Sequence, residues 1–166
     1  RESILGNDGD FSIEGIVARY NTDLANNLGN LVSRVATVVH SKCGGTGPRP
    51  VADSPLAEIA RTAVSEATAA WDRFAPQAAL EATWRLIGAT NSYLEDHAPW
   101  KLDAGHEVDV VMGDALEAIR IVTVLITPAM PSVAATIWER LGLSGTPTDG
   151  GLDAVTSWGG YPGAPV

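Results

Sequence analysis

Two polar side chains suited to hydrogen-bonded recognition lie four residues apart, at Asn30 and Arg34. In a helix this spacing places both on one face, beside the apolar stripe of the same segment. Asp23 and Asn27 extend them into a polar strip along the edge of the core face. An amide and a guanidinium at such a seam can reach the edges of nucleic acid bases. Two simpler roles are also open. Asn30 could form a hydrogen bond across a bundle, and Arg34 could be solvated or paired with Asp23 or with an acid on the next helix.

The second candidate is Trp100, which follows Pro99 directly. An indole offers a face on which an unstacked base can stack, worth on the order of 1–3 kcal/mol per base. Pro99 restricts the backbone just before Trp100 and so fixes how the ring is presented. The alternative for a tryptophan after a proline at a helix end is a partly buried lid over the core.

Residues for catalysis form no recognisable constellation. The glycine-rich run 44–49 lacks the Gly-Lys-Ser/Thr ending of a phosphate loop and follows a helix instead of a strand. The sequence has no Glu-x-x-His pair of a di-iron bundle. The adjacent acids Glu95 and Asp96 would diverge by about 100 degrees on a helix. We therefore expect that this chain by itself is not an enzyme.

The sequence also predicts no metal centre. The three histidines, His40, His97 and His106, are expected at helix ends or in loops, solvated or capping. Cys43 is the single cysteine, so neither a disulfide framework nor a zinc site can be built from thiols. We interpret it as a small filler near a helix end. One thiol in 166 residues fits a reducing, cytoplasmic setting.

The composition is that of a globular domain, with 45% hydrophobic and 19% charged residues. No apolar run approaches the ~18 residues that cross a membrane, and the N-terminus does not resemble a signal peptide. The first residue is Arg1, so we expect the chain to begin within a longer protein. The net charge of −9 argues against binding RNA through a general basic field. Any RNA contact would have to be local.

Apolar residues recur at helical spacing nearly throughout, which predicts an all-α antiparallel bundle of about five to six helices. Residues 1–11 are interpreted as a linker, 12–142 as the helical domain and 143–166 as an irregular tail. Within the domain we expect helices over 12–23, 24–42, from Ser54-Pro55, from Pro76, over about 105–127, and from a cap at Ser132. The helices from Ser54-Pro55 and from Pro76 are each expected to bury one stripe. The first stripe is Leu56, Ile59, Ala63, Ala67, Ala70 and Phe74, and the second is Leu80, Trp84, Ile87, Asn91 and Leu94.

Asn91 interrupts the second stripe, and we interpret it as a buried polar residue that fixes helix register. Trp71, Trp84 and Trp138 fall on apolar faces and are predicted to belong to the core.

Residues 19–34 read Arg-Tyr-Asn-Thr-Asp-Leu-Ala-Asn-Asn-Leu-Gly-Asn-Leu-Val-Ser-Arg. This run resembles the motif that opens the helical domain of methionyl-tRNA synthetases. Three further matches follow the family's order: Asp8-Gly9-Asp10-Phe11-Ser12; Asn91-Ser92-Tyr93-Leu94-Glu95 with Ala98-Pro99-Trp100; and Leu125-Ile126-Thr127-Pro128-Ala129-Met130-Pro131. The catalytic HIGH and KMSKS motifs of the family are missing from the sequence.

The resemblance implies the anticodon-binding domain of a class Ia aminoacyl-tRNA synthetase that carries out ATP-dependent methionyl-tRNA aminoacylation for protein biosynthesis. In the family, the positions matching Asn30, Arg34, Pro99 and Trp100 contact the CAU anticodon of methionine tRNA. The resemblance also implies that ATP, methionine and any zinc bind in a catalytic portion outside this chain. We expect a cytoplasmic monomer that partners tRNA and its own catalytic domain. Two alternatives stay open: a helical protein-interaction module without RNA binding, or the same domain of another class I synthetase.

Overall fold

The computed structural model describes residues 27–166, so the predicted linker (1–11) and the predicted helix over 12–23 lie outside the described residues. Helices make up the described fold, which confirms the all-α prediction. They are α2 (Asn30–Lys42), α3 (Pro55–Asp72), α4 (Pro76–His97), the 3-10 helix η2 (Pro99–Lys101), α5 (His106–Ile126), α6 (Pro131–Arg140) and α7 (Leu152–Thr156). Within residues 27–166 the β-type pairing is confined to one isolated bridge, between Thr46 and Pro165.

Proline begins three of these α-helices, α3, α4 and α6, and also the 3-10 helix η2. At α3 the prediction is confirmed, since Ser54 Oγ accepts a hydrogen bond from the Leu56 amide at 3.2 Å and Pro55 follows the cap. The cap predicted at Ser132 is wrong, because α6 already begins at Pro131 and has no side-chain cap. Proline has a fixed φ and no N–H, which suits the first helical position. Ser132 therefore lies inside the first turn.

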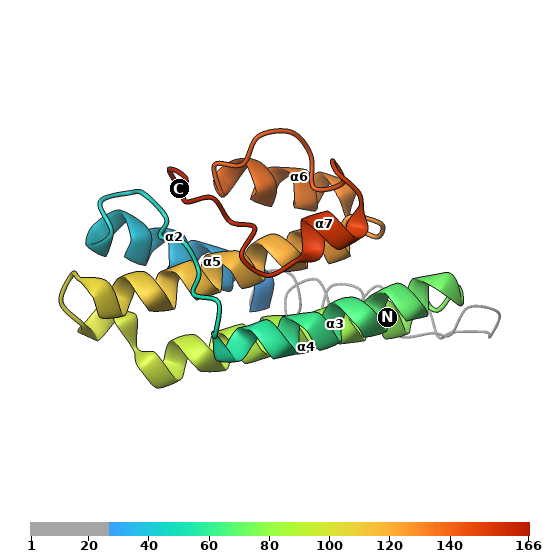
Figure 1. Cartoon of the computed structure of the whole chain (residues 1–166), viewed down its shortest axis with the longest axis horizontal. Helices are drawn as coiled ribbons and strands as arrows, with labels where there is room; N and C mark the ends of the chain where they lie inside the picture. Colours follow the sequence, from blue (N-terminus) through green and yellow to red (C-terminus); the bar gives the residue numbers. More distant parts are fainter. Residues whose placement is uncertain (1–26) are drawn as a thin grey trace, which may run out of the picture.

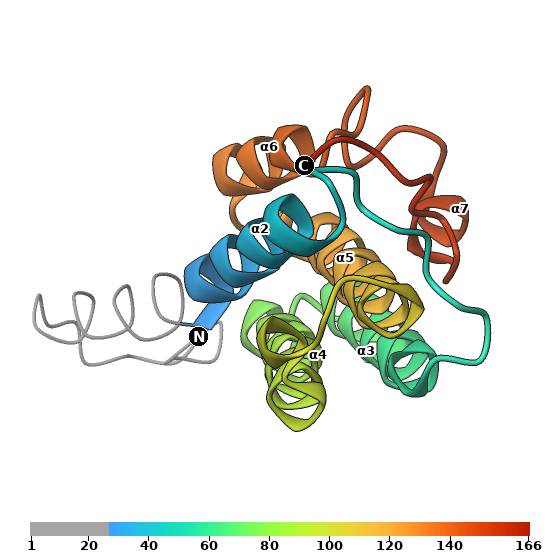
Figure 2. The ribbon, with the colours of Figure 1, turned by 90° about the vertical axis from the view of Figure 1, so that its left-hand side faces the viewer.

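The central element is α5, in which every residue from Val111 to Ile126 is buried. Figures 1 and 2 show α3 and α4 paired along one side of α5, with α2 and α6 on the other side. Along the chain, α4 runs antiparallel to α3, and α5 runs antiparallel to α4 (Figure 1). A helix that is covered on all sides must be apolar nearly all round. This explains why α5 reads as the most hydrophobic segment of the chain.

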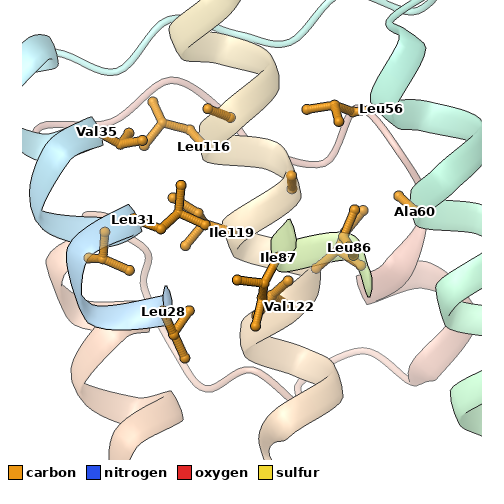
Figure 3. Packing of buried hydrophobic residues seen from close by; sticks show 14 of the residues in the cluster. Leu28, Leu31, Val35, Leu56, Ala60, Leu86, Ile87, Leu116, Ile119 and Val122 are labelled. Atoms are coloured by element: carbon orange, nitrogen blue, oxygen red, sulfur yellow. The ribbon is translucent and has the colours of Figure 1, made fainter. Parts of the chain in front are cut away.

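The core is continuous across α5. In Figure 3, side chains of α2 meet those of α5 on one side, and side chains of α3 and α4 meet it on the other. Burying each leucine or isoleucine contributes on the order of 1.5–3 kcal/mol of transfer free energy. The labelled contact residues are Leu28, Leu31, Val35, Leu56, Ala60, Leu86, Ile87, Leu116, Ile119 and Val122.

Two residues of the predicted α3 stripe are not in the core. Ile59 is 39% exposed, because the buried face of α3 passes through Leu56 and Ala60 and leaves Ile59 on its flank. Phe74 is 77% exposed, because α3 ends at Asp72 and Phe74 takes a left-handed conformation with φ of 53° in the turn. Trp138 is buried as predicted, whereas Trp71 and Trp84 pack against the core while partly exposed.

The segment 143–166, for which an irregular tail is predicted, packs on the bundle and contains the short helix α7. Tyr161 is 1% exposed, and its hydroxyl lies 3.2 Å from the carbonyl oxygens of both Leu141 and Ala164. The Val166 amide donates to the Gly45 carbonyl at 3.1 Å, which ties the end of the chain to the loop after α2. The C-terminal segment is thus part of the folded body.

Candidate nucleic-acid interface

Arg34, one turn into α2, points across the bundle to α4. Its Nη2 donates to Asn91 Oδ1 at 2.8 Å, and its Nη1 lies 3.8 Å from Glu95 Oε1. Asn91 is itself fixed, because its Nδ2 donates to the Ile87 carbonyl at 3.1 Å. Arg34 is therefore paired, but its partners lie on α4 and not on the next helix, α3, where an acidic partner is expected from the sequence. The other expected partner, Asp23, lies outside the described residues. The Arg34–Glu95 pair is open to solvent on both sides, so its own contribution to stability is small.

Trp100 is brought directly against Arg34. The guanidinium carbon lies 5.5 Å from the centre of the indole ring, within the range of a cation–π contact. Trp100 is 40% exposed, while Pro99 beside it is buried. One part of the indole thus faces Arg34 while another faces solvent.

The corner that presents Trp100 depends on an unusual backbone. Ala98, at the C-terminus of α4, has φ of 42° and ψ of 54°, the left-handed conformation that a side chain disfavours by roughly 1–2 kcal/mol. Its amide still donates to the Leu94 carbonyl at 2.9 Å, and its carbonyl accepts from the Lys101 amide at 2.8 Å. Pro99 then begins η2, where the backbone N–H that proline lacks is not needed because the first residue of a helix has no partner for it within the helix. The chain reverses within four residues and holds Trp100 at the rim.

Asn30 stands apart from this pair. It is the first residue of α2, it is exposed, and its side chain makes no hydrogen bond to the other residues in the described range. It lines an open hollow between α2 and α6, together with Ser33, Val133 and Arg140. The structure therefore brings Arg34, Pro99 and Trp100 together and leaves Asn30 one helical turn away on the same edge.

The position of α4 along α5 is set by a buried polar contact. The Tyr93 hydroxyl donates to Asp114 Oδ2 at 3.1 Å, and the other carboxylate oxygen accepts from the Val51 amide at 3.0 Å. Burial, followed by the charge of Asp114 and this hydrogen bond, raises the pKa of Tyr93 well above its usual value. The His97 ring packs 4.2 Å from the Tyr93 ring, between centres. These contacts hold the end of α4 that carries Asn91 and Glu95 and leads into η2, where Trp100 lies.

Comparison with known proteins shows the family to which the chain belongs. Residues 1–36 match the family described as tRNA synthetases class I (M). The methionine–tRNA ligase of Synechocystis is 36% identical over 152 residues, which cover 87% of this chain and 29% of that protein. The methionine–tRNA ligase of Mycobacterium leprae is also 36% identical, over 86% of this chain and 28% of its own length. The chain belongs to the methionyl-tRNA synthetase family. It spans between 22% and 33% of the length of the relatives it matches.

The fold agrees with solved methionyl-tRNA synthetases. The Mycobacterium tuberculosis enzyme bound by methionyl-adenylate superposes with a TM-score of 0.87 at 32% identity, covering 100% of this chain and 34% of that one. Its apo form gives a TM-score of 0.80 at 34% identity over 87% of this chain and 31% of its own. The helical architecture of this synthetase-family chain is therefore that of its relatives.

Two residues of this corner were not predicted from the sequence as part of a site. Asn91 is half-buried and binds Arg34, whereas it was interpreted only as fixing helix register. Glu95 was considered only as half of a catalytic pair with Asp96, and it lies beside Arg34 instead. Both stand on one face of α4, four residues apart, just before the Pro99-Trp100 turn. That spacing relative to Trp100 is the signal that could have identified them.

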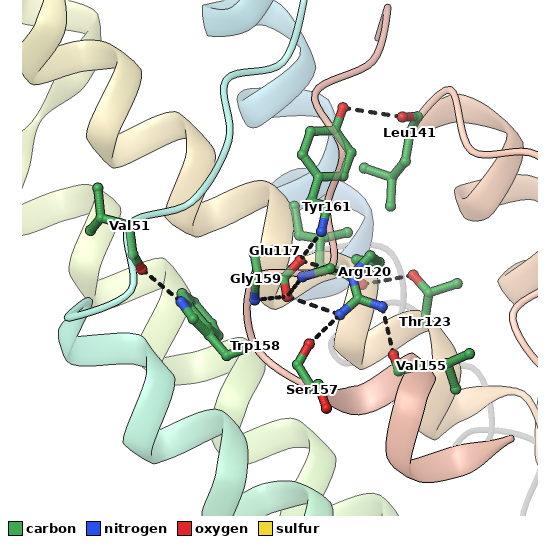
Figure 4. A network of polar contacts seen from close by, with 12 residues as sticks. Val51, Glu117, Arg120, Thr123, Leu141, Val155, Ser157, Trp158, Gly159 and Tyr161 are labelled. Atoms are coloured by element: carbon green, nitrogen blue, oxygen red, sulfur yellow. Dashed lines mark hydrogen bonds and ion pairs between the residues drawn. The ribbon is translucent and has the colours of Figure 1, made fainter. Parts of the chain in front are cut away.

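The sequence also missed a charged cluster inside the family domain. Glu117 and Arg120 of α5 are 0% and 3% exposed and form a bidentate pair at 2.8 and 2.9 Å. The Glu117 carboxylate accepts three further bonds from the amides of residues 159–161, and Arg120 donates to the carbonyls of Val155 and Ser157. Trp158 donates from its indole to the Val51 carbonyl at 2.8 Å (Figure 4). This cluster fixes the C-terminal segment on α5.

Metal ligation and membrane insertion find no support in residues 27–166. No three histidine, cysteine, aspartate or glutamate side chains of this range are grouped so that they could hold a metal ion. None of the helices described there is long and apolar enough to span a bilayer.

Proposed function

We propose that the edge formed by Asn30, Arg34, Pro99 and Trp100 binds the CAU anticodon of methionine tRNA. The observation that carries the proposal is the contact between Arg34 and Trp100. It sets a hydrogen-bond donor and a partly exposed indole face side by side, 5.5 Å apart. Single-stranded loop bases are recognised through this combination of stacking and edge hydrogen bonds.

The state of Arg34 supports the proposal. A guanidinium has five N–H donors, and within the described residues only Nη2 makes a hydrogen bond. The Nε atom is buried without a partner, and the 3.8 Å contact of Nη1 with Glu95 is too long for a hydrogen bond. Arg34 thus has donor capacity left for a base, while Asn91 holds its orientation. Asn30, which is exposed one turn earlier, would supply a second recognition group on the same edge.

Family membership supports a wider proposal for the whole protein. We propose that it ligates methionine to tRNA with ATP, and that this chain selects the tRNA by its anticodon. ATP, methionine and any zinc would bind in the portion of the protein that the relatives have and this chain lacks. A cytoplasmic setting and a monomeric state belong to the same proposal.

The test measures, by fluorescence anisotropy, how tightly a fluorescein-labelled anticodon stem-loop binds to the 166-residue chain. We expect the CAU loop to bind more tightly than loops with one anticodon base changed. Trp100→Ala should weaken CAU binding by about 1–3 kcal/mol, roughly 5- to 150-fold, with an unchanged helical circular dichroism spectrum. Arg34→Gln should reduce the preference for CAU. Arg85→Gln, which removes an exposed ion-paired arginine elsewhere on α4, is the matched control and should have no effect.

The net charge of −9 favours one competing function, a protein-docking module of the same fold. That function predicts no binding to any stem-loop even at low salt. Equal binding of all loops, whatever the anticodon, would contradict anticodon reading as well. Collapse of the helical spectrum in Trp100→Ala would assign that residue to the core instead.

A further inference from the structure

The lysines and histidines of the chain are not spread evenly over the fold. The whole sequence contains two lysines, Lys42 and Lys101, and three histidines. Lys42 is the last residue of α2, and Lys101 is the last residue of η2. The histidines stand in the last turn of α2, at the end of α4 and at the start of α5. All five residues therefore stand at the ends of three helices and of η2.

The topology brings these helix ends together. α2 and α4 both run antiparallel to α5, so their C-terminal ends lie beside its N-terminal end, on the left in Figure 1. The Cys43 thiol at the end of α2 lies close enough to Asp109, in the first turn of α5, for that carboxylate to help raise the pKa of the thiol. η2 joins α4 to this same end of α5. Residues from three separate stretches of sequence thus share the end of the bundle that carries Trp100.

The two lysines differ in their pairing from three of the arginines. Arg61, Arg85 and Arg120 are each held by a glutamate, at Glu58, Glu66 and Glu117. Neither lysine forms an ion pair or a side-chain hydrogen bond with a residue in the range 27–166. Lys101 is exposed and follows Trp100 directly, and Lys42 is half-buried on the neighbouring helix end. Among the described residues, their ammonium groups therefore have no anionic partner.

This end of the bundle is not basic as a whole. It also carries the acids Glu95, Asp96, Asp103, Glu107 and Asp109. Glu95 faces Arg34 and Asp109 lies close to the Cys43 thiol, while the others lie at helix ends or in the turn before α5. A general field would therefore not attract a polyanion here. Two unpaired ammonium groups can still make point contacts with phosphates that base recognition has already brought close.

We propose that Lys101 and Lys42 contact phosphates of the RNA strand whose bases Arg34 and Trp100 read. The inference rests on the proposed function, because it assumes an RNA loop at Trp100. Phosphate contacts fix the register of a strand on a protein, and base contacts specify its sequence. The two lysines would do the first, while Asn30, Arg34 and Trp100 would do the second.

The experiment compares two double variants of the 166-residue chain that lose the same number of positive charges. Lys42→Gln/Lys101→Gln removes the proposed contacts. Arg73→Gln/Arg85→Gln removes charges from the α3–α4 hairpin; Arg73 lies beyond the far end of α4, which is 22 residues or about 33 Å long. Binding of the CAU stem-loop and of one loop with an altered anticodon is measured by anisotropy between 25 and 200 mM KCl.

We expect the lysine variant to flatten the dependence of log affinity on log salt by about 0.7 for each lost contact, about 1.4 in total. The weakening should be the same factor for both loops, because phosphate contacts carry no sequence information. The arginine variant should keep the slope of the unmodified chain. This pattern would support the lysine contacts.

Two other outcomes overturn the inference in different ways. If the unmodified chain prefers CAU but the lysine variant keeps its salt slope, or changes it no more than the arginine variant, the lysines make no phosphate contact and anticodon reading stands. If the lysine variant loses the preference for CAU, the lysines act in base reading and the assignment is also wrong. Absence of binding by the unmodified chain at every salt concentration would reject the proposed function, and this inference with it.

Discussion

Arg34 illustrates how single residues define the candidate site. Its guanidinium is held by an amide, approached by a carboxylate and covered by an indole, and all three groups come from the end of α4 and η2. Asn91 is the member that sets geometry, since it is itself fixed to the backbone of its own helix. Its role would be to position Arg34, without touching RNA.

The positioning role of Asn91 can be tested at this scale. Asn91→Ala should weaken CAU stem-loop binding by about 1–2 kcal/mol, roughly 5- to 30-fold, because a hydrogen bond to a charged group is lost. Asn91→Asp keeps an acceptor for Arg34 and should retain most of the affinity. Ser92→Ala, at an exposed neighbour, is the control. Equal losses for Asn91→Ala and Asn91→Asp, together with a lowered Tm, would point to a structural role alone.

Cys43 provides a second residue-scale prediction. Burial, followed by the hydrogen bond and charge of Asp109, raises the pKa of its thiol to about 11. At pH 8.5 less than about 1% of Cys43 is then in the thiolate form, whereas a free cysteine is about half ionised at that pH. We expect iodoacetamide to alkylate Cys43 at least ~50-fold more slowly than it alkylates the thiol of glutathione. The extent of alkylation of this single cysteine is measured by mass spectrometry. Asp109→Asn should speed the reaction, and an unchanged rate would show that burial alone protects the thiol.

At the scale of elements, the turn between α3 and α4 carries local strain. Phe74 combines a left-handed φ of 53° with 77% exposure, so its side chain gains little from packing. Phe74→Gly should raise the free energy of unfolding by about 1 kcal/mol, because glycine adopts this conformation without a steric penalty. The expected rise in Tm is about 2–4 °C. Phe74→Ala keeps the strain and should stay near the unmodified Tm; an equal rise in both variants would refute the backbone explanation.

At the scale of the whole molecule, one buried ion pair joins the C-terminal segment to the bundle. Glu117 accepts five hydrogen bonds in all, two of them from Arg120 and three from the backbone amides of residues 159–161. Gly160 leaves room for the Arg120 side chain, because a Cβ at this position would lie only 2.6 Å from Arg120 Nη2 and would clash with it. The segment that follows α6 is therefore ordered through α5 and not by helical periodicity of its own.

Removal of this pair should destabilise the fold strongly. Glu117→Gln leaves the Arg120 charge buried and unpaired, so we expect a loss of about 3–5 kcal/mol in urea unfolding. The tail should also become sensitive to proteolysis around residues 155–161. Glu66→Gln breaks an exposed ion pair with Arg85 and should cost less than about 1 kcal/mol. A comparable, small loss for both variants would show that the pair does not fix the tail.

The sequence determined the helical class, most helix starts and much of the core by itself. Helical period and the prolines at 55 and 76 are local signals, because they depend on neighbours within one turn. The pairing of Pro99 with Trp100, and the place of Arg34 beside an apolar stripe, could be predicted for the same reason. The anticodon-reading role of these residues stays a prediction that the stem-loop experiment addresses.

Only the tertiary structure decided how separate helices meet. Arg34 and Asn91 are 57 residues apart, and Glu117 binds amides more than 40 residues later. No local period encodes such contacts, since they depend on how α2, α4 and the tail are placed around α5. The exposure of Ile59 and Phe74 and the gathering of Lys42 and Lys101 at one end of the bundle have the same origin. Periodicity fixes which face of a helix is apolar, and packing fixes which helix ends, and hence which charges, become neighbours.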